Sequence, residues 1–478
     1  MAAQTTVQHE QGAEDPAVTN FRRYLRIKTV EPDPDYAGAI EFLKEMAGEM
    51  GLPVQCIEVH PGKTIVIITW EGTDPTLKSI ILNSHIDVVP ASADHWKCDP
   101  FEAKKMENGD IYARGTQDMK CVGIQYLEAI RRLIKKGQRL LRTVHMLFVP
   151  DEELGGFKGM KLFVQTPQFQ KLNMGFGLDE GLANPTEKFT LFYGERATWW
   201  IDVICTGDPG HASKFVEDTA AEKAVSYNEE IFLLELGKLC FIFTNNFGVL
   251  LVMEFPRFIV DYRVNSTKSI CLSSFCFFKY FCLQRRVMNA FLGYRDEEMK
   301  RLSTEKLGDI QTVNLVRMSL LPFKNLFSFM LSQGGVANNI VPIELRLRFD
   351  LRLSPQQTPE FLENKIKEMI ASAGEGVSFE WIRKGVCYST PLDDKNVWWQ
   401  TFKKVCDEKK LELETGVFQA ATDSCYIRAL GIPVIGFSPI NNTPILLHDH
   451  NEYLNEGVFL RGINIYESLI SAIANVPE

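Results

Sequence analysis

Apolar positions in the first part of the chain repeat with two periods that alternate along the sequence. Residues 36–50 carry apolar side chains at helical spacing, and a Gly-Leu-Pro sequence ends this pattern. Apolar runs typical of β-strands follow at 64–70 and 79–83. A helical pattern over 119–136 then precedes another strand-like run at 143–149. Strands that alternate with helices predict an α/β fold with a mostly parallel central sheet, covered on both faces.

The middle of the chain has a different pattern. Strand-like alternation appears at 198–205 and 345–353, and a helical pattern follows at 359–373. The helix and strand pattern of the first part resumes at Asn396 and continues to the end. The predicted domains are therefore a first domain formed by residues 1–192 and 386–478, and an inserted α+β domain formed by residues 193–385.

Two apolar stretches inside the inserted domain fit neither pattern. Residues 226–285 are rich in Phe and Cys, and residues 318–331 form a shorter apolar interruption. Polar residues and a proline, among them Asn245 and Pro256, break up the longer stretch. A transmembrane helix needs about 20 consecutive apolar residues, so we predict no membrane anchor there.

The composition is that of an ordinary globular protein and excludes several function classes. The 478 residues suffice for two domains, since single cores stop growing near ~250–300 residues. A formal net charge of −9 argues against wide contacts with nucleic acid or an anionic membrane. The N-terminal residues show neither a signal peptide nor a mitochondrial presequence, and the 11 cysteines include no C-x-x-C pair. We therefore expect a reduced, cytosolic protein.

Acidic side chains and histidines collect where predicted strands end. His85 and Asp87 lie two positions apart after the strand at 79–83, so they project from the same face. Each cluster alone has an ordinary structural interpretation, since a single His-x-Asp is typical of a strand end and Asp118 is typical of a helix N-cap. Together the clusters predict a metal site, because ligands collect at the carboxyl ends of such strands. The remaining clusters are Glu152 with Glu153, Asp179 with Glu180, and His448 with Asp449 and His450.

The balance of charge favours a pair of divalent ions. Two zinc ions carry four positive charges, and the carboxylates of Asp118, Glu153 and Glu180 together with one hydroxide ion would offset them. Mixed imidazole and carboxylate ligands suit zinc, with cobalt or manganese as substitutes. Paired ions of this kind usually lie ~3.5–4 Å apart.

Six motifs occur in one order: SHIDVVP, ARGTQDMK, VPDEELGG, LDEG, GHAS and LHDHNE. In this order they resemble the zinc peptidase family that includes acetylornithine deacetylase and succinyl-diaminopimelate desuccinylase. The resemblance covers nearly the whole chain apart from the two apolar stretches. It implies a zinc-exopeptidase-like catalytic domain with an inserted dimerisation or lid domain. It also implies two zinc ions per subunit, with His85 and Glu180 on one, Glu153 and His448 on the other, and Asp118 bridging them.

The resemblance also implies roles for residues beside the metal ligands. Asp87 would support His85, and Glu152 would be the general base that activates water. His211, which alone could be an ordinary surface histidine, would reach across a homodimer into the partner's active site and stabilise the oxyanion. Asn339 and Arg352 would bind the substrate, although Arg352 could also be an exposed strand residue.

The activity implied by the resemblance is hydrolysis of N-acyl-L-amino acids. A dipeptidase of the carnosine type is the first alternative, since it shares the metal chemistry and differs in the acyl pocket. A non-catalytic dimeric binding protein on the same fold is the second. The family has no counterpart of the stretches 226–285 and 318–331, and our hypothesis is that they are translated intron-like sequence or an error in the gene model.

Overall fold

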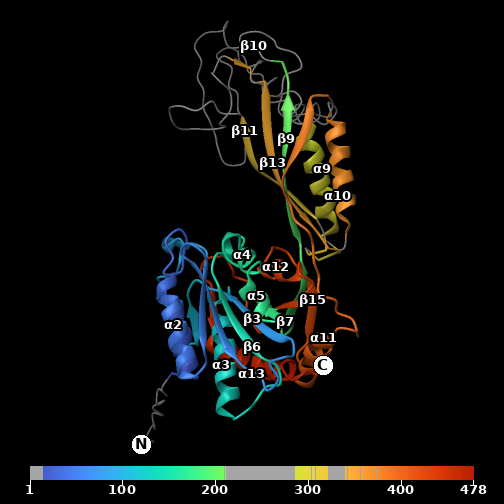
Figure 1. The fold of residues 1–478 in the computed structure, drawn as a ribbon. Helices are drawn as coiled ribbons and strands as arrows, with labels where there is room; N and C mark the ends of the chain where they lie inside the picture. Colours follow the sequence, from blue (N-terminus) through green and yellow to red (C-terminus); the bar gives the residue numbers. More distant parts are fainter. Residues whose placement is uncertain are drawn as a thin grey trace, which may run out of the picture. The chain divides into compact units, whose positions relative to one another are not determined.

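The computed structural model divides the chain into two compact units, which are described separately. One unit comprises Met1–Arg196 with Cys387–Glu478, and the other comprises Ala197–Val386. Figure 1 shows the elements of both units, coloured along the sequence. The structure describes residues 14–208, 210–211, 286–302, 304–306, 308–309, 311–320, 340–341, 343–355, 357–373 and 375–477.

An eight-stranded mixed sheet forms the centre of the first unit. The pairs β3–β6, β3–β7, β7–β16 and β8–β15 are parallel, and the other three neighbouring pairs are antiparallel. This arrangement confirms the predicted α/β fold with a mostly parallel sheet. In spatial order the strands are β1 (Val54–His60), β2 (Lys63–Trp70), β6 (Val144–Val149), β3 (Ser79–His85), β7 (Met174–Asp179), β16 (Val434–Phe437), β8 (Phe189–Glu195) and β15 (Leu413–Phe418).

Hydrophobic clusters cover both faces of this sheet. Successive residues of one strand belong to different clusters: Ile80 and Leu82 pack in one, and Ile81 packs in the other. Because both faces are buried, the strands appear in the sequence as continuous apolar runs. The larger cluster includes α1 (Pro16–Leu25), α2 (Tyr36–Glu49), α3 (Lys120–Lys135), α11 (Val397–Glu408) and α13 (Glu456–Ile473). The smaller one includes residues of α4 (Met160–Phe163), α5 (Pro167–Lys171) and α12 (Ser424–Arg428).

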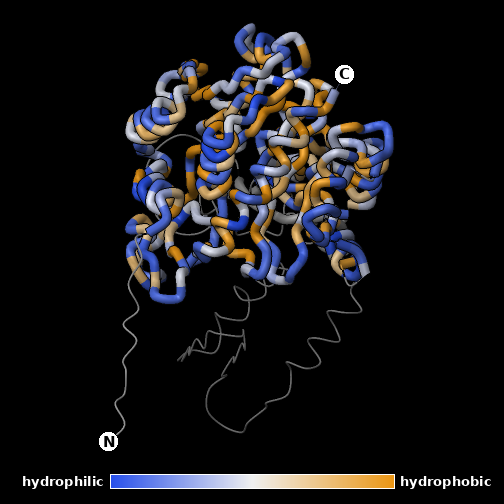
Figure 2. The backbone as a smooth tube through the Cα atoms, turned by 90° about the horizontal axis from the view of Figure 1, so that it is seen from below, coloured by the Kyte–Doolittle hydropathy of each residue, from blue (hydrophilic) through white to orange (hydrophobic). Residues whose placement is uncertain are grey.

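The hydropathy of the chain follows this layering. In Figure 2 hydrophobic stretches gather in the interior of the packed elements, and hydrophilic stretches lie mostly at outer turns and outer helix faces.

None of the described helices combines the length and the apolar character needed to cross a membrane.

A smaller antiparallel sheet joins the segment around residue 111 to the segment around residue 454. It consists of β17 (Tyr453–Asn455), β5 (Asp110–Tyr112) and β4 (Lys104–Lys105). Tyr453 pairs with Tyr112, and Asn455 pairs with Asp110. The register therefore brings the chain after residue 452 alongside the chain before residue 113. A short 3-10 helix, η1 (Ala93–His95), lies between β3 and β4 in the sequence.

The described residues of the second unit include a four-stranded antiparallel sheet and two helices. The strand order is β11 (Thr312–Leu320), β13 (Glu344–Leu353), β9 (Ala197–Thr206) and β14 (Val377–Lys384). Helices α9 (Arg286–Arg301) and α10 (Pro359–Ser372) belong to the same unit, and Phe291 of α9 stacks on Phe349 of β13 with ring centroids 4.2 Å apart. β10 (Gly210–His211) pairs with β12 (Ile340–Val341).

Most of the two unusual apolar stretches lies outside the described residues. This holds for residues 226–285 and for residues 321–331. Met318, Ser319 and Leu320 are described, and they continue strand β11 opposite Leu347, Arg346 and Leu345. The first three residues of the shorter stretch are therefore part of the sheet.

Candidate metal centre

Five predicted ligands come together in the first unit, three of them at the carboxyl ends of neighbouring strands; His448, also expected at a strand end, lies in a loop instead. His85 is the last residue of β3, Glu180 follows β7, and Glu153 lies in the 3-10 helix η2 (Glu152–Leu154) just after β6. Asp118 lies in the loop before α3, and His448 in the loop before β17. β3 is parallel to both β6 and β7, so these three strands end at the same edge of the sheet.

The ring of His85 is fixed by its backbone surroundings. Its Nδ1 donates to the backbone carbonyl oxygen of Asp87 at 2.8 Å, while the nearer carboxylate oxygen of Asp87 lies 3.9 Å away. A carbonyl can only accept, so Nδ1 carries a hydrogen and Nε2 faces the acids. Nε2 lies 2.9 Å from Asp118 Oδ1 and 3.6 Å from Glu180 Oε2.

Asp118 occupies the position between the two histidines. Its Oδ1 faces His85, and its Oδ2 lies 3.2 Å from Nε2 of His448. It does not cap α3, because the N-cap is Met119 and no side chain accepts a hydrogen bond there. His448 also approaches Oε2 of Glu153 at 3.0 Å. The carboxylate of Asp118 therefore has the placement of a ligand shared between two positions.

The carboxylate of Asp87 holds the turn that carries two adjacent glutamates. It is fully buried and accepts the backbone N–H of Glu152 at 3.2 Å and of Glu153 at 3.0 Å. The turn begins at Asp151, whose φ of 78° lies in the left-handed region. Asp87 thus acts on the site in two ways, orienting His85 through its carbonyl and η2 through its carboxylate.

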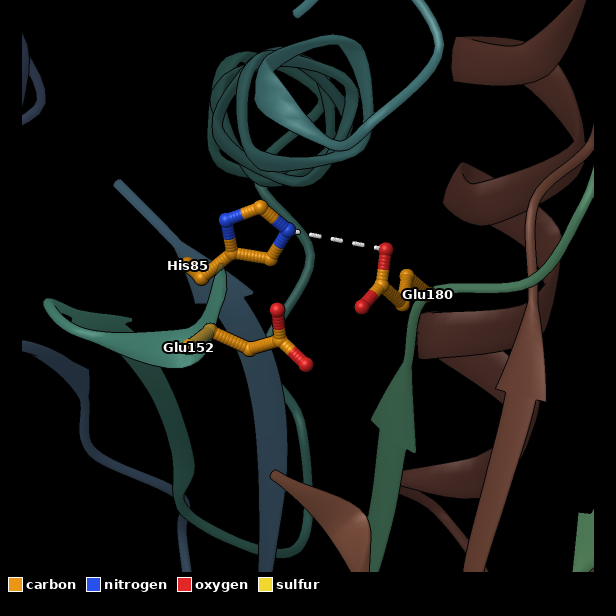
Figure 3. A group of neighbouring side chains, drawn as sticks. All are labelled: His85, Glu152 and Glu180. Atoms are coloured by element: carbon orange, nitrogen blue, oxygen red, sulfur yellow. Dashed lines mark ion pairs between the residues drawn. The ribbon is translucent and has the colours of Figure 1, made fainter. Parts of the chain in front are cut away.

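Figure 3 shows the side chains of His85, Glu152 and Glu180 pointing toward one another from three separate elements. Ligand atoms of these three residues lie within 4.8 Å of one another, as do those of His85, Asp118 and Glu153. Glu152 is thus close enough to the same space to act on a molecule bound there.

The crowded acids shift one another's protonation. Burial raises the pKa of Glu152 and of Glu180 well above the usual value, and burial with the charge of Asp118 raises that of Glu153 to about 7. Burial also acts to raise the pKa of Asp118, but hydrogen bonds from His448 and His85 hold it well below its usual range. Hydrogen bonds to Asp118 and Glu153 raise the pKa of His448 to about 10. The raised pKa values mean that protons on these side chains neutralise part of the negative charge of the acids. Bound divalent cations would neutralise the same charge.

A second observation, independent of the pKa values, shows that these donor atoms fit divalent cations. Oε1 of Glu153 is buried and has no hydrogen-bond partner among the described residues, although its other oxygen faces His448. A buried carboxylate oxygen without a partner is costly unless it coordinates a cation. Imidazole and carboxylate donors in a space of this size suit zinc.

The predicted residues of the inserted domain are described only in part. The backbone of His211 pairs with Ile340 in the β10–β12 sheet, and Asn339 lies outside the described residues. Arg352 lies on β13, where its guanidinium donates to both carboxylate oxygens of Asp350 at 2.7 and 3.2 Å. Its side chain is therefore paired within its own strand in this structure.

Glu452 and Asp423 are buried acids of the first unit that were not among the predicted site residues. Glu452 accepts hydrogen bonds from the loop that carries Asp118, and its side chain is fully buried. Asp423 lies against Gly156, and neither of its carboxylate oxygens has a hydrogen-bond partner among the described residues. Glu452 belongs to the LHDHNE motif, which offered a signal, whereas no pattern around Asp423 indicates burial.

Comparisons with known proteins agree with this site. The model of peptidase family M20/M25/M40 matches residues 81–472, a range that includes every predicted metal ligand. Aminoacylase-1A of Rattus norvegicus is 47% identical over 469 residues, which cover 97% of each chain.

Solved structures of low sequence identity show the same fold. The M20 family metallo-carboxypeptidase Sso-CP2 from Sulfolobus solfataricus has a TM-score of 0.61 at 16% identity, covering 97% of this chain and 100% of that one. Human carnosine dipeptidase 1 has a TM-score of 0.55 at 14% identity, covering 96% and 97%. The resemblance inferred from the motifs is confirmed: the chain belongs to peptidase family M20/M25/M40 and is a homologue of aminoacylase-1.

Proposed function

We propose that this chain is a zinc-dependent amidohydrolase that removes the acyl group from N-acyl-L-amino acids, with two zinc ions per subunit. The observation that carries the proposal is the placement of Asp118, whose two carboxylate oxygens face the imidazoles of His85 and His448. The identity of 47% with aminoacylase-1A over nearly the whole chain supports the substrate class. The likeness to carnosine dipeptidase 1, at 14% identity, supports the fold alone.

In this proposal the five ligands divide into two sets. His85 and Glu180 hold one zinc ion, Glu153 and His448 hold the other, and Asp118 is shared. When bound, the two ions supply positive charge that makes a water molecule acidic and polarises the amide carbonyl. The short approaches of Asp118 and Glu153 to His448 support the second set.

Glu152 moves the proton in the proposed reaction. Its carboxylate faces His85 and Glu180 but lies outside both proposed ligand sets (Figure 3). It accepts a proton from the attacking water and later donates it to the nitrogen of the leaving amino acid. The backbone N–H of Glu152 donates to the carboxylate of Asp87, and this hydrogen bond fixes the backbone from which the Glu152 side chain extends.

The second unit would complete the site by dimerisation. We propose that the chain forms a homodimer in which His211 donates to the developing oxyanion in the partner's active site. Asn339 and Arg352 would bind the substrate, with Arg352 exchanging its pairing with Asp350 for the substrate carboxylate. The cytosol stays the predicted location.

A substrate panel with metal analysis tests the proposed function. The purified full-length chain is assayed with N-acetyl-L-methionine and with carnosine, before and after removal of metal by a chelator, and its zinc content is measured by mass spectrometry. We expect two zinc ions per chain, and a kcat/KM for N-acetyl-L-methionine at least ~100-fold higher than for carnosine. Preference for carnosine would contradict the substrate class, and activity that survives metal removal would contradict the chemistry. Zinc binding without hydrolysis of either substrate would favour a binding protein.

A further inference from the structure

His448 differs from the other proposed ligands in how it is held. Its side chain is 52% exposed, compared with 1% for His85 and 10% for Asp118. It lies in a loop outside any helix or strand, with a φ of 62° in the left-handed region. A half-exposed side chain on a loop has more conformational freedom than a buried one, so other residues must place it for metal binding.

The residues flanking His448 are tied to the loop that carries Asp118. On one side, the side-chain oxygen of Gln117 accepts the backbone N–H of Leu446 at 3.0 Å. On the other side, Nη1 of Arg114 donates to the backbone carbonyl oxygen of Asp449 at 3.1 Å. The loop of His448 is therefore held two residues before the ligand and at the residue that follows it.

Gln117 makes two further ties to the same segment. Its side-chain nitrogen donates to the backbone carbonyl oxygens of Pro444 at 3.1 Å and of Tyr453 at 2.9 Å. Tyr453 begins β17, which pairs with β5. The side chain of Gln117 thus spans the loop from its start to the strand that ends it.

Glu452 binds the loop that carries Asp118 through its side-chain carboxylate. Its buried carboxylate accepts from Nη1 of Arg114 at 2.8 Å, from the backbone N–H of Gly115 at 3.2 Å and from that of Gln117 at 2.6 Å. All three side chains are buried, with 2% of Arg114, 4% of Gln117 and none of Glu452 exposed. Charge-assisted hydrogen bonds of this kind are stronger than neutral ones.

We propose that Arg114, Gln117 and Glu452 form a brace of positioning residues that places His448 opposite Asp118. This inference rests on the proposed two-metal function. The metal position that uses His448 and Glu153 then depends on the brace. The position that uses His85 and Glu180 depends on the brace less, because it shares only Asp118, whose backbone N–H also donates to Glu452 at 3.4 Å, while His85 is oriented separately by the backbone of Asp87.

Zinc titration of four proteins tests the brace: the wild type, His448→Gln, Glu452→Gln and a control, Glu456→Gln. Glu456 pairs with Lys105 at 2.6 Å, partly exposed at the start of α13, so its variant makes the same chemical change outside the brace. We expect Glu452→Gln to weaken, by about 10–100-fold, the binding step that His448→Gln abolishes, and to weaken the other step, which shares only Asp118 with it, by less. Wild-type affinity at both steps, or equal weakening of both, would overturn the brace.

Hydrogen exchange of the metal-free protein gives a second readout. In Glu452→Gln and in Gln117→Leu, backbone amides of 115–118 and of 446–450 should exchange faster together, while those of 85–89 keep the wild-type rate. Faster exchange at 115–118 alone would show that the two loops are not coupled. Gln117→Leu keeps the backbone N–H that reaches Glu452, so it tests the side-chain ties if Glu452→Gln folds poorly. The number of zinc steps in the wild type tests the proposed function, and the variants test the brace.

Discussion

Glu152 and Glu153 are neighbours in the chain with different surroundings. Glu153 faces His448 and Asp118 on one side of η2, and Glu152 faces His85 and Glu180. The backbone N–H groups of both residues donate to the carboxylate of Asp87, so the turn fixes the positions of the two Cα atoms from which the side chains extend. A difference of one position along a tight turn thus separates a proposed ligand from a proposed base.

This separation predicts the behaviour of Glu152→Gln. The substitution keeps the size of the side chain but removes the proton acceptor, so kcat should fall by about 10²–10⁴-fold or more while the zinc content stays at the wild-type value. Steady-state kinetics and metal analysis on the same preparation check this. Glu107→Gln, an exposed surface change, is the control. A variant that loses zinc along with activity would show Glu152 to be a ligand instead.

His145 provides a pH-dependent prediction away from the site. It is buried on β6, its Nδ1 lies 2.9 Å from the hydroxyl of Thr69, and burial lowers its pKa to about 4. The unfolded chain binds a proton near pH 6.5 and the folded one only near pH 4, so stability should fall by about 3 kcal/mol as the pH drops through this window.

The test is denaturant unfolding at several pH values. His145→Gln should remove most of the acid-induced loss between about pH 6.5 and 4, because glutamine does not titrate there. His60→Gln, the same change at a partly exposed position, is the control variant. An unchanged slope in His145→Gln would mean that other groups cause the acid sensitivity.

At the scale of elements, α12 is attached to the sheet by one buried ion pair. Nη1 of Arg428 lies 2.7 Å from Oε1 of Glu195 at the end of β8, and its other nitrogens donate to the carbonyl oxygen of Val434 at the start of β16. The side chains of both partners are only 4% exposed. Removing one partner of such a pair leaves a buried charge without compensation.

Arg428→Ala should therefore lower the free energy of unfolding by about 3–5 kcal/mol. Lys188→Ala is the matched control, since it breaks a surface pair with Glu412, whose partners are 45% and 66% exposed, and should cost no more than about 1 kcal/mol. Chemical denaturation of both variants measures the difference. Similar losses in the two variants would contradict the importance of burial at α12.

At the scale of the whole molecule, every predicted metal ligand lies in the first unit and the two unusual apolar stretches lie in the second. An apolar insertion in the unit that is proposed to dimerise should hinder the dimer and promote aggregation, so we expect both effects from residues 226–285. Deletion of 226–285 and 321–331 should raise the fraction of dimer in light scattering and the kcat for N-acetyl-L-methionine. The second deletion starts at 321 because strand β11 extends through Leu320.

Zinc content should not change with these deletions, because the ligands lie outside both stretches. Equal dimer fraction and equal kcat with and without the stretches would show that they are tolerated. A clean messenger RNA that contains both would contradict the hypothesis that they are translated intron-like sequence or a gene-model error.

The sequence by itself determined many of the elements, and the family. Strands such as β3 and β6 are short apolar runs, and α3 has a helical period, so local patterns predict them. The motifs placed His85, Asp118, Glu153, Glu180 and His448 in order along the chain, and all but His448 lie next to an element end. Such patterns depend on neighbouring residues alone, so they can be recognised without knowledge of the fold.

Only the tertiary structure decided how these residues meet. It showed that Asp118 faces two histidines instead of capping α3, and that Asp87 contacts His85 through its carbonyl. It also revealed Glu452, whose hydrogen bonds reach residues more than 300 positions away in the sequence. A local pattern cannot report such contacts, because burial and hydrogen-bond geometry depend on which distant segments pack together.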